Sequence, residues 1–388
     1  WFPGARLNFA ENLLRHRGSG TALISLLENG ARSEISFDAL YAQVASVSAA
    51  LNACGVVPGD RIAGFMPNVT ETVVAMLAAT SLGAVWTSCS PDFGFQGVMD
   101  RFGQVKPKVL FAADGYYYNG KAHDSLAKIR QIADEIESLE TVVIVEVVSD
   151  TPDLQYIRNA VPLAQWHSDF AATSDIEFAQ LPFDHPLYIM YSSGTTGVPK
   201  CIVHGAGGTL IQHLKEHKLH CDVGPQDTLF YFTTCGWMMW NWLVSGLASG
   251  ATLVLYDGSP FADEGGVLLD TIDRERITVF GISAKFISGI EKAGLKPRGS
   301  HDLSSLKTVL STGSPLSHES FEYVYRDLKE DVLLASIAGG TDIISCFVGG
   351  CPTRPVYTGQ IQCRALGMAV EFWDEAGKSL AEGKGELV

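Results

Sequence analysis

The stretch of sequence that decides the fold reads LYIMYSSGTTGVPKCIVH and runs from residue 187 to residue 204. Apolar and aromatic residues at each end predict two strands, and the turn between them concentrates hydroxyls, glycines and one lysine. Glycines let backbone N–H groups approach an anion, hydroxyls add donors, and Lys200 adds a mobile positive charge. We therefore predict a phosphate-binding loop made of Ser192, Ser193, Gly194, Thr195, Thr196, Gly197 and Lys200.

This loop is not the P-loop of many nucleotide-binding proteins. Gly194 and Gly197 stand too close together for that pattern, and Pro199 precedes the lysine. A flexible Ser/Gly surface loop is the alternative interpretation.

Strand and helix patterns alternate on both sides of the loop. Ser36 is a predicted N-cap for a helix that runs to about Ala53, and Asn68 with Glu71 resembles a capping box for a helix that runs to Leu82. Strands separated by helix-length segments indicate parallel sheets. The predicted strands are 61–66, 84–87, 109–112, 141–146, 187–191, 201–204, 228–232, 252–256, 278–281, 307–310 and 332–337.

The irregular, proline-containing segment 149–186 predicts a join between two α/β halves. After Pro352 the pattern changes to short strands and turns. The expected fold class is therefore α/β, with two parallel-sheet subdomains packed together, about 1–180 and 181–350, and the start of a small antiparallel β subdomain, 351–388. Because the chain starts at Trp1 and stops at Val388 without a visible terminator, we expect a fragment cut at both ends.

The composition excludes several classes of partner. A net charge of −15 over 388 residues argues against nucleic acid and anionic membrane surfaces, although it permits a local phosphate site. No apolar run reaches the roughly 18 residues that a membrane span needs. Eight cysteines without a CxxC motif predict unpaired thiols in a reducing compartment, hence a cytoplasmic location. The oligomeric state stays open.

The segment YSSGTTGVPK resembles the signature loop of the superfamily that comprises AMP-forming acyl-CoA synthetases, adenylation domains and luciferases. Two further motifs agree with it in order and spacing, and the resemblance covers essentially the whole chain. STGSP at 311–315 resembles the family's adenine-contacting strand end, with Ser314 where glutamate is common. GGTD at 339–342 resembles the motif whose threonine contacts phosphate and whose acid binds Mg²⁺, although Asp342 is one methylene shorter than the usual glutamate.

The resemblance implies an AMP-binding N-terminal domain over residues 1–388, with a C-terminal domain that bears a catalytic lysine absent from this chain. It implies ATP, Mg²⁺ and CoA: a carboxylate attacks the α-phosphate, pyrophosphate leaves, and the CoA thiol then takes the acyl group. A chain without the lysine is expected to bind ATP or AMP but to complete the reaction poorly. The residues implied are Lys200, Thr341 and Asp342 for catalysis, Gly313, Ser314, Pro315 and Gly340 beside the loop for the nucleotide, and Asp342 with Thr196 for Mg²⁺.

The opening stretch WFPGARLNFAENLL resembles the branch of the family that activates acetate or acetoacetate, and the stretches 236–260 and 339–350 resemble its acetoacetate-using members. The implied acid pocket consists of Trp237, Met238, Met239, Thr312 and Gly339, where glycine at 339 would leave room for an acid longer than acetate. Either Trp237 or Thr312 could donate to a ketone. Another short acid, such as propionate or butyrate, and an adenylate-binding fragment without turnover remain the alternatives.

Two further clusters have less specific interpretations. His213, His217 and His220, with Cys221, share one face of a predicted helix. Zinc binding is one interpretation, but the interleaved charged residues favour a solvated face. Tyr116–Tyr118, followed by Asn119-Gly120-Lys121, could contact the CoA adenine or form a packed aromatic turn, and His204 is expected to fill space beneath the loop.

Overall fold

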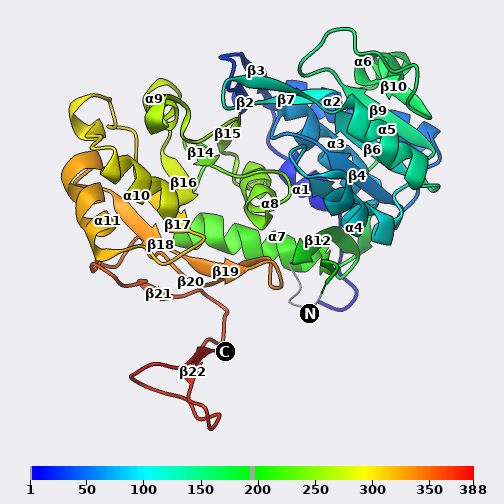
Figure 1. The fold of residues 1–388 in the computed structure, drawn as a ribbon. Coiled ribbons are helices and arrows are strands. Elements are labelled where there is room, and N and C mark those ends of the chain that lie inside the picture. The colour runs from blue at the N-terminus through cyan, green and yellow to red at the C-terminus, as the bar shows by residue number, and fades with distance from the viewer. Residues whose placement is uncertain (1, 193–196) are drawn as a thin grey trace.

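The computed structural model describes residues 2–192 and 197–388, and Figure 1 shows two α/β lobes side by side. Each lobe is built on a seven-stranded sheet. The first sheet has the order β10 (Ala160–Pro162), β9 (Thr141–Val145), β6 (Val109–Ala113), β4 (Arg61–Phe65), β5 (Val85–Cys89), β12 (Pro186–Ser192) and β13 (Lys200–Gly205). The second has the order β18 (Leu333–Ser336), β17 (Thr308–Thr312), β16 (Val279–Ser283), β14 (Thr228–Tyr231), β15 (Thr252–Asp257), β2 (Thr21–Leu27) and β3 (Arg32–Ser36).

Neighbouring strands in both sheets are parallel, apart from the antiparallel edge pairs β12–β13 and β2–β3. The predicted α/β class with two parallel-sheet subdomains is therefore confirmed. The helices are α1 (Phe9–Leu13), α2 (Phe37–Ala53), α3 (Thr70–Ser81), α4 (Phe95–Val105), α5 (Leu126–Glu135), α6 (Leu163–Trp166), α7 (Ala206–Lys215), α8 (Met238–Ser245), α9 (Gly266–Arg274), α10 (Ala284–Lys292) and α11 (His318–Tyr323).

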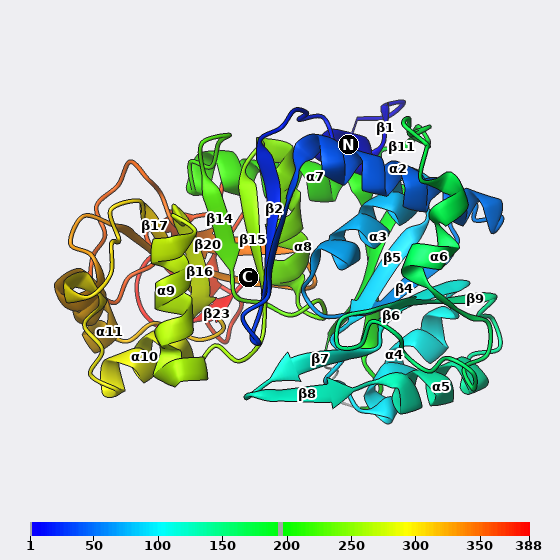
Figure 2. The same ribbon diagram turned by 90° about the horizontal axis from the view of Figure 1, so that it is seen from above.

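The boundary predicted near residue 180 does not match the sheets. β2 and β3, at the start of the chain, complete the second sheet, and β12 and β13 complete the first (Figure 2). The reason is packing: one continuous apolar cluster joins both sheets through α3 and α8, and within it the rings of Trp86 and Trp240 stack 6.4 Å apart. The two lobes therefore share one hydrophobic cluster.

Two predicted helix starts have different outcomes. The Ser36 side chain accepts the Ala39 N–H at the start of α2, as predicted. The Asn68 capping box is wrong, because Val69 is the N-cap of α3 and makes no side-chain cap. The Asn68 Oδ1 instead accepts the indole N–H of Trp240 at 3.0 Å, a contact between residues 172 positions apart.

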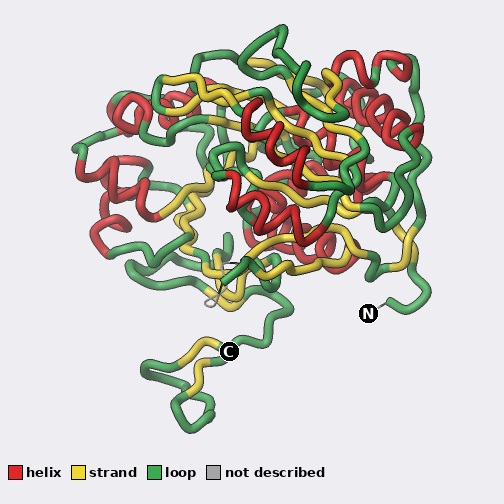
Figure 3. The backbone as a smooth tube through the Cα atoms, turned by 45° about the vertical axis from the view of Figure 1, so that its right-hand side comes forward, coloured by secondary structure: helices red, strands yellow, loops and turns green. Residues whose placement is uncertain are grey.

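The C-terminal part contains short antiparallel strands, and these begin at residue 338, before the change of pattern that the sequence predicts after Pro352. β19 (Ala338–Gly340), β20 (Ser345–Gly349) and β21 (Cys363–Arg364) form a three-stranded sheet. The pair β22 (Phe372–Trp373) and β23 (Glu386–Leu387) lies away from the body of the molecule (Figures 1 and 3). The remaining pairs are β7 (Gly115–Tyr118) with β8 (Lys121–Asp124) and β1 (Arg6–Leu7) with β11 (Leu181–Pro182).

Short helical turns complete the described part of the chain. Two are π-helical, at Glu216–His220 and Val324–Leu328. Four are 3₁₀ turns, at Ser168–Phe170, Gly246–Ser249, Ala262–Gly265 and Pro297–Gly299. No helix within residues 2–192 and 197–388 combines the length and apolarity needed to cross a membrane.

Candidate active site

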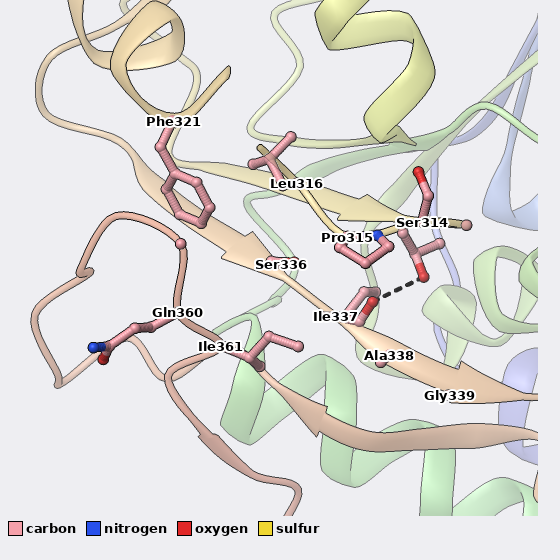
Figure 4. A pocket seen from close by; sticks show the side chains of 13 residues that line it. Ser314, Pro315, Leu316, Phe321, Ser336, Ile337, Ala338, Gly339, Gln360 and Ile361 are labelled. Carbon is pink, nitrogen blue, oxygen red and sulfur yellow. Dashed lines mark hydrogen bonds between the residues drawn. The ribbon is translucent and has the colours of Figure 1, made fainter. Parts of the chain in front are cut away.

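Two adjoining cavities open at the carboxyl end of β17. The Phe321 cavity, of about 400 Å³, is lined by residues 312–316, Phe321, 336–339 and 359–361. In Figure 4 Leu316 and Phe321 stand on one side of it, and Gln360 and Ile361 come from the loop opposite. The Trp237 cavity, of about 510 Å³, is lined by Phe93, Arg101, 191–192, 236–239, 312–313, Ile337, 339–342 and Cys346. Because both cavities share Thr312, Gly313, Ile337 and Gly339, a ligand could extend from one into the other.

The local backbone explains why the cavities meet there. Gly313 follows β17 directly and has a φ of +88°, a conformation that glycine adopts without strain. The Thr312 hydroxyl donates to the Ile337 carbonyl at 2.9 Å and ties the end of β17 to the segment that precedes β19. The site thus lies at the carboxyl end of a parallel sheet, where α/β folds commonly bind ligands.

Most of the predicted site residues come together around these cavities. Gly313, Ser314 and Pro315 line the Phe321 cavity, next to Thr312 and Gly339. The Trp237 cavity collects the others, which are Ser192, Trp237, Met238, Met239, Thr312, Gly339, Gly340, Thr341 and Asp342. Segments separated by up to 150 positions therefore share one site, although their roles remain predictions.

The predicted phosphate loop lies partly outside this description. Ser193, Gly194, Thr195 and Thr196 are outside the described residues. Gly197 has a φ of +135°, and Lys200 is an exposed residue at the start of β13, where it pairs with Ser192. Because Ser192 lines the Trp237 cavity, the two strands bring the ends of the loop to its edge.

Thr341 and Asp342 lie in the turn between β19 and β20. Asp342 is exposed at the cavity wall. The carbonyl oxygen of Thr341 accepts a hydrogen bond from Nε2 of His204 at 2.7 Å. Burial lowers the pKa of His204, an effect that this carbonyl and the nearby Asp342 carboxylate oppose. His204 therefore supports the turn, in addition to filling space as predicted.

Arg101 is a charged residue of the site that the sequence did not reveal. Its guanidinium lies over the Phe93 ring, 4.6 Å from the centroid, and over the Tyr191 ring at 5.6 Å. One of its N–H groups donates to the Gly97 carbonyl at 2.7 Å. The only signal in the sequence was its place on the amphipathic helix α4, which does not distinguish it from a surface arginine.

The acid pocket differs from its sequence interpretation at Gly339. A Cβ atom there would lie 2.0 Å from the Ser345 carbonyl oxygen, so a side chain at 339 would meet backbone before it reached the cavity.

The tryptophans of this region have two different environments. Trp240 and Trp242 are buried in the core, whereas Trp237 is 57% exposed and lines the Trp237 cavity.

The histidine cluster is not the solvated helix face that we predicted. His213, His217 and His220 are all buried, because α7 and the π-helical turn Glu216–His220 pack against β20 and α8. His213 and His220 each hydrogen-bond a backbone carbonyl, and the described residues contain no group of three His, Cys, Asp or Glu side chains that could hold a metal ion.

The tyrosine stretch forms the first strand of the β7–β8 hairpin. The Tyr116 ring stacks on the His123 ring with centroids 4.9 Å apart. This fits a packed aromatic turn, and contact with CoA stays a prediction.

Two parallel sheets with a shared core and cavities at the strand ends are the arrangement with which α/β proteins commonly bind a ligand. The family model described as "AMP-binding enzyme" matches residues 9–388, and the chain belongs to this family. It is 55% identical over 389 residues to the acetoacetyl-coenzyme A synthetase of Rhizobium meliloti (strain 1021) and 51% identical over 398 residues to the acetoacetyl-CoA synthetase of Mus musculus.

A solved acetoacetyl-CoA synthetase from Streptomyces lividans superposes on the whole chain with a TM-score of 0.94 and 44% identity, and the match covers 60% of that structure. All of this chain aligns with the two curated relatives, but it spans only 59% of their length.

Proposed function

We propose that this chain is the nucleotide- and acid-binding part of an AMP-forming ligase that activates acetoacetate with ATP and transfers the acyl group to CoA. The observation that carries the proposal is the meeting of the 312–315, 339–342 and 236–239 segments at two adjoining cavities. The similarity to acetoacetyl-CoA synthetases supports the choice of acid.

In the first step a carboxylate oxygen attacks the α-phosphorus of ATP, the bond to the β-phosphate oxygen breaks, and pyrophosphate leaves. Two anions must approach each other, so the site has to supply positive charge and N–H donors where negative charge accumulates. Lys200, the amides of its loop and the guanidinium of Arg101 would supply them. The CoA sulfur then attacks the acyl carbon, and AMP leaves.

The residues at the cavity wall fit a magnesium ion bound chiefly through phosphate. Mg²⁺ prefers oxygen ligands and usually binds proteins through one or two carboxylates plus substrate phosphates. The Asp342 carboxylate, exposed at the cavity wall beside Thr341, would be such a ligand. When bound, the ion would neutralise charge on the phosphates.

Trp237 and Thr312 are the two candidate donors for the acetoacetate ketone, and their hydrogen bonds support one of them. The Thr312 hydroxyl already donates to Ile337. The Trp237 indole, exposed in the cavity, has no hydrogen-bond partner within residues 2–192 and 197–388, so we assign the donor to its N–H. The lysine-bearing domain, a cytoplasmic location and the partition into an AMP-binding domain over 1–388 remain part of the proposal.

The experiment is acid-dependent exchange of labelled pyrophosphate into ATP by the intact protein. We expect acetoacetate to give the highest kcat/KM, ahead of acetate, propionate and butyrate. A higher kcat/KM with propionate or butyrate would favour the synthetase of another short acid. Nucleotide binding without exchange, with any of these acids, would identify an adenylate-binding module.

A further inference from the structure

The turn that carries Thr341 and Asp342 has a strained backbone. Ile344, its last residue, has a φ of +48°. A β-branched residue rarely adopts this left-handed conformation, which persists only where the surroundings impose it. The turn therefore needs contacts from outside its own hairpin to keep its shape.

Side chains from β13 and α7 provide such contacts at both ends of the turn. Nε2 of His204 meets the Thr341 carbonyl at 2.7 Å, and Nε2 of His213 meets the Ile344 carbonyl at 2.9 Å. Because a carbonyl only accepts, Nε2 carries the proton in both rings. Burial lowers the pKa of His213 to about 4, so its ring stays neutral near pH 7.

Glu216 holds the strand that follows the turn. Its carboxyl group is buried, and Oε1 accepts the Cys346 N–H at 3.0 Å as well as the Ser345 hydroxyl. Oε2 accepts the indole N–H of Trp242 at 2.9 Å, and the Lys215 Nζ lies 3.6 Å from Oε1. The three hydrogen-bond donors are directional, so the carboxyl group fixes where Ser345 and Cys346 lie.

The backbone around Glu216 departs from a regular α-helix. Glu216 is the first residue of the π-helical turn that ends at His220. Such turns are rare and occur frequently at functional sites. Here the turn follows α7 directly, so α7 supplies Gln212 and His213 to the same hairpin that Glu216 contacts.

We propose that Glu216 is a positioning residue that sets the place of Thr341 and Asp342 through Ser345 and Cys346. The transmission is short, because Ser345 pairs with Gly340 across the hairpin, and Gly340 directly precedes Thr341. A shift of β20 therefore moves the predicted phosphate and magnesium contacts. The inference rests on the proposed function, since it concerns residues that the proposed reaction uses.

The test compares Glu216→Gln with Glu275→Gln in the intact protein. Glu275 is also a buried carboxylate, paired with Arg32 and Arg274, and neither arginine lines the two cavities. We expect Glu216→Gln to lower kcat for pyrophosphate exchange and to raise the Mg²⁺ concentration for half-maximal rate, each by about 10- to 100-fold, the usual range for groups that orient a metal ligand. The Kd for ATP measured without Mg²⁺ should change less than either value, by about threefold at most, because only the predicted Thr341 contact shifts and residues 313–315 lie outside this hairpin. Glu275→Gln should alter none of these values.

Hydrogen exchange gives a readout that does not depend on catalysis. The Cys346 amide should lose protection in Glu216→Gln and keep it in Glu275→Gln, because a glutamine has one acceptor oxygen where Glu216 uses two for the Cys346, Ser345 and Trp242 donors. If Glu216→Gln does not fold, Ser345→Ala decides by the same measurements.

Equal Mg²⁺ dependence and equal Cys346 protection in the two glutamate variants would overturn the inference. Absence of exchange activity in the wild type with every acid would instead overturn the proposed function, while amide protection would still show whether Glu216 holds the turn.

Discussion

Gly339 in β19 packs directly against the backbone of Ser345 in β20. A Cβ atom on Gly339 would lie 2.0 Å from the Ser345 carbonyl oxygen and 2.7 Å from the Cys346 Cα. Both are backbone atoms, which cannot rotate away as a side chain could. The pairing of Gly339 with Cys346 also follows a register irregularity at Ala338. Glycine at this position therefore permits the close approach of two strands.

Gly339→Ala should accordingly destabilise the protein by about 1–3 kcal/mol, the usual cost of overpacking. Gly340→Ala is the matched control, because a Cβ there comes no nearer than 4.0 Å to the Asp342 nitrogen. Urea unfolding measures both. Exchange with acetoacetate and with acetate should fall in parallel in Gly339→Ala. A Gly339→Ala protein as stable as Gly340→Ala, with a changed preference between the acids, would restore the pocket-volume interpretation.

The sequence predicts those features whose determinants are local. The Ser36 cap, the strands on either side of the phosphate loop and the cavity segments at 312–315 and 339–342 each depend on residues a few positions apart. The family resemblance predicts that these segments belong to one site, and their residues line the two adjoining cavities.

The features that could not be predicted depend on distant partners. Asn68 pairs with Trp240 instead of capping its own helix. His213 is buried because Ser245 and Ile344 satisfy both ring nitrogens, from 32 and 131 positions away. β2 and β3 join a sheet whose other strands begin some 200 residues later. No periodicity or composition encodes such pairings, so tertiary packing decides them.

Trp237→Phe should lower kcat/KM for acetoacetate by about 5- to 10-fold, the effect of losing one hydrogen bond of roughly 1 kcal/mol. Phenylalanine keeps an aromatic side chain but is smaller than tryptophan, so an acid without a ketone has to control for the change in shape. Butyrate is the matched acid, because it has the same chain length without the ketone, and its kcat/KM should change by less than about twofold. Equal losses with both acids would show that the indole N–H does not contact the ketone.

Lys200→Ala should lower the rate of pyrophosphate exchange by about 10²- to 10³-fold, as expected when one preorganised donor is removed. ATP binding should weaken far less, because the charge matters most as negative charge grows on the α-phosphate. Kd and kcat are measured separately. Lys218→Ala, which removes an exposed lysine from the π-helical turn, is the control and should behave as wild type. Normal turnover in Lys200→Ala would exclude its loop as the catalytic cradle.

The Cys351 thiol should be alkylated more readily than the thiols of Cys89, Cys221 and Cys235. Its hydrogen bond with the Thr353 hydroxyl lowers the pKa of the Cys351 thiol, whereas burial raises the pKa of the other three. Since the thiolate reacts, iodoacetamide at pH 7.5 should modify Cys351 at least about tenfold faster. Peptide mass spectrometry gives the order, and Thr353→Val should slow the reaction. Earlier labelling of Cys221 or Cys235 would contradict the structure at these sites.

Asp257, at the end of β15, should make the protein less stable as the pH rises. Burial raises the pKa of its carboxyl group to about 7, although the Asn68 N–H, which donates to Oδ1 at 3.3 Å, opposes the shift. Between about pH 4 and 7 the folded protein thus keeps a proton that the unfolded chain has lost. The free energy of unfolding then falls by up to about 1.4 kcal/mol per pH unit and levels off above pH 7.

Asp257→Asn isolates this contribution, because an amide of the same shape does not ionise. The variant should gain stability relative to wild type at pH 8, and the gain should shrink steadily towards pH 4. His213 makes the free energy of unfolding change with pH in the opposite direction. Because both proteins contain His213, comparing them at each pH removes its contribution. Its pKa of about 4 lies below that of a free histidine, so its contribution to stability rises with pH between about 4 and 6.5.

Asp150→Asn, at an exposed position, controls for the loss of one negative charge and should show no such trend. Urea unfolding at pH 5, 6.5 and 8 measures the differences. A stability difference between Asp257→Asn and wild type that stays constant across this range would mean that Asp257 titrates as an ordinary, hydrated carboxylate.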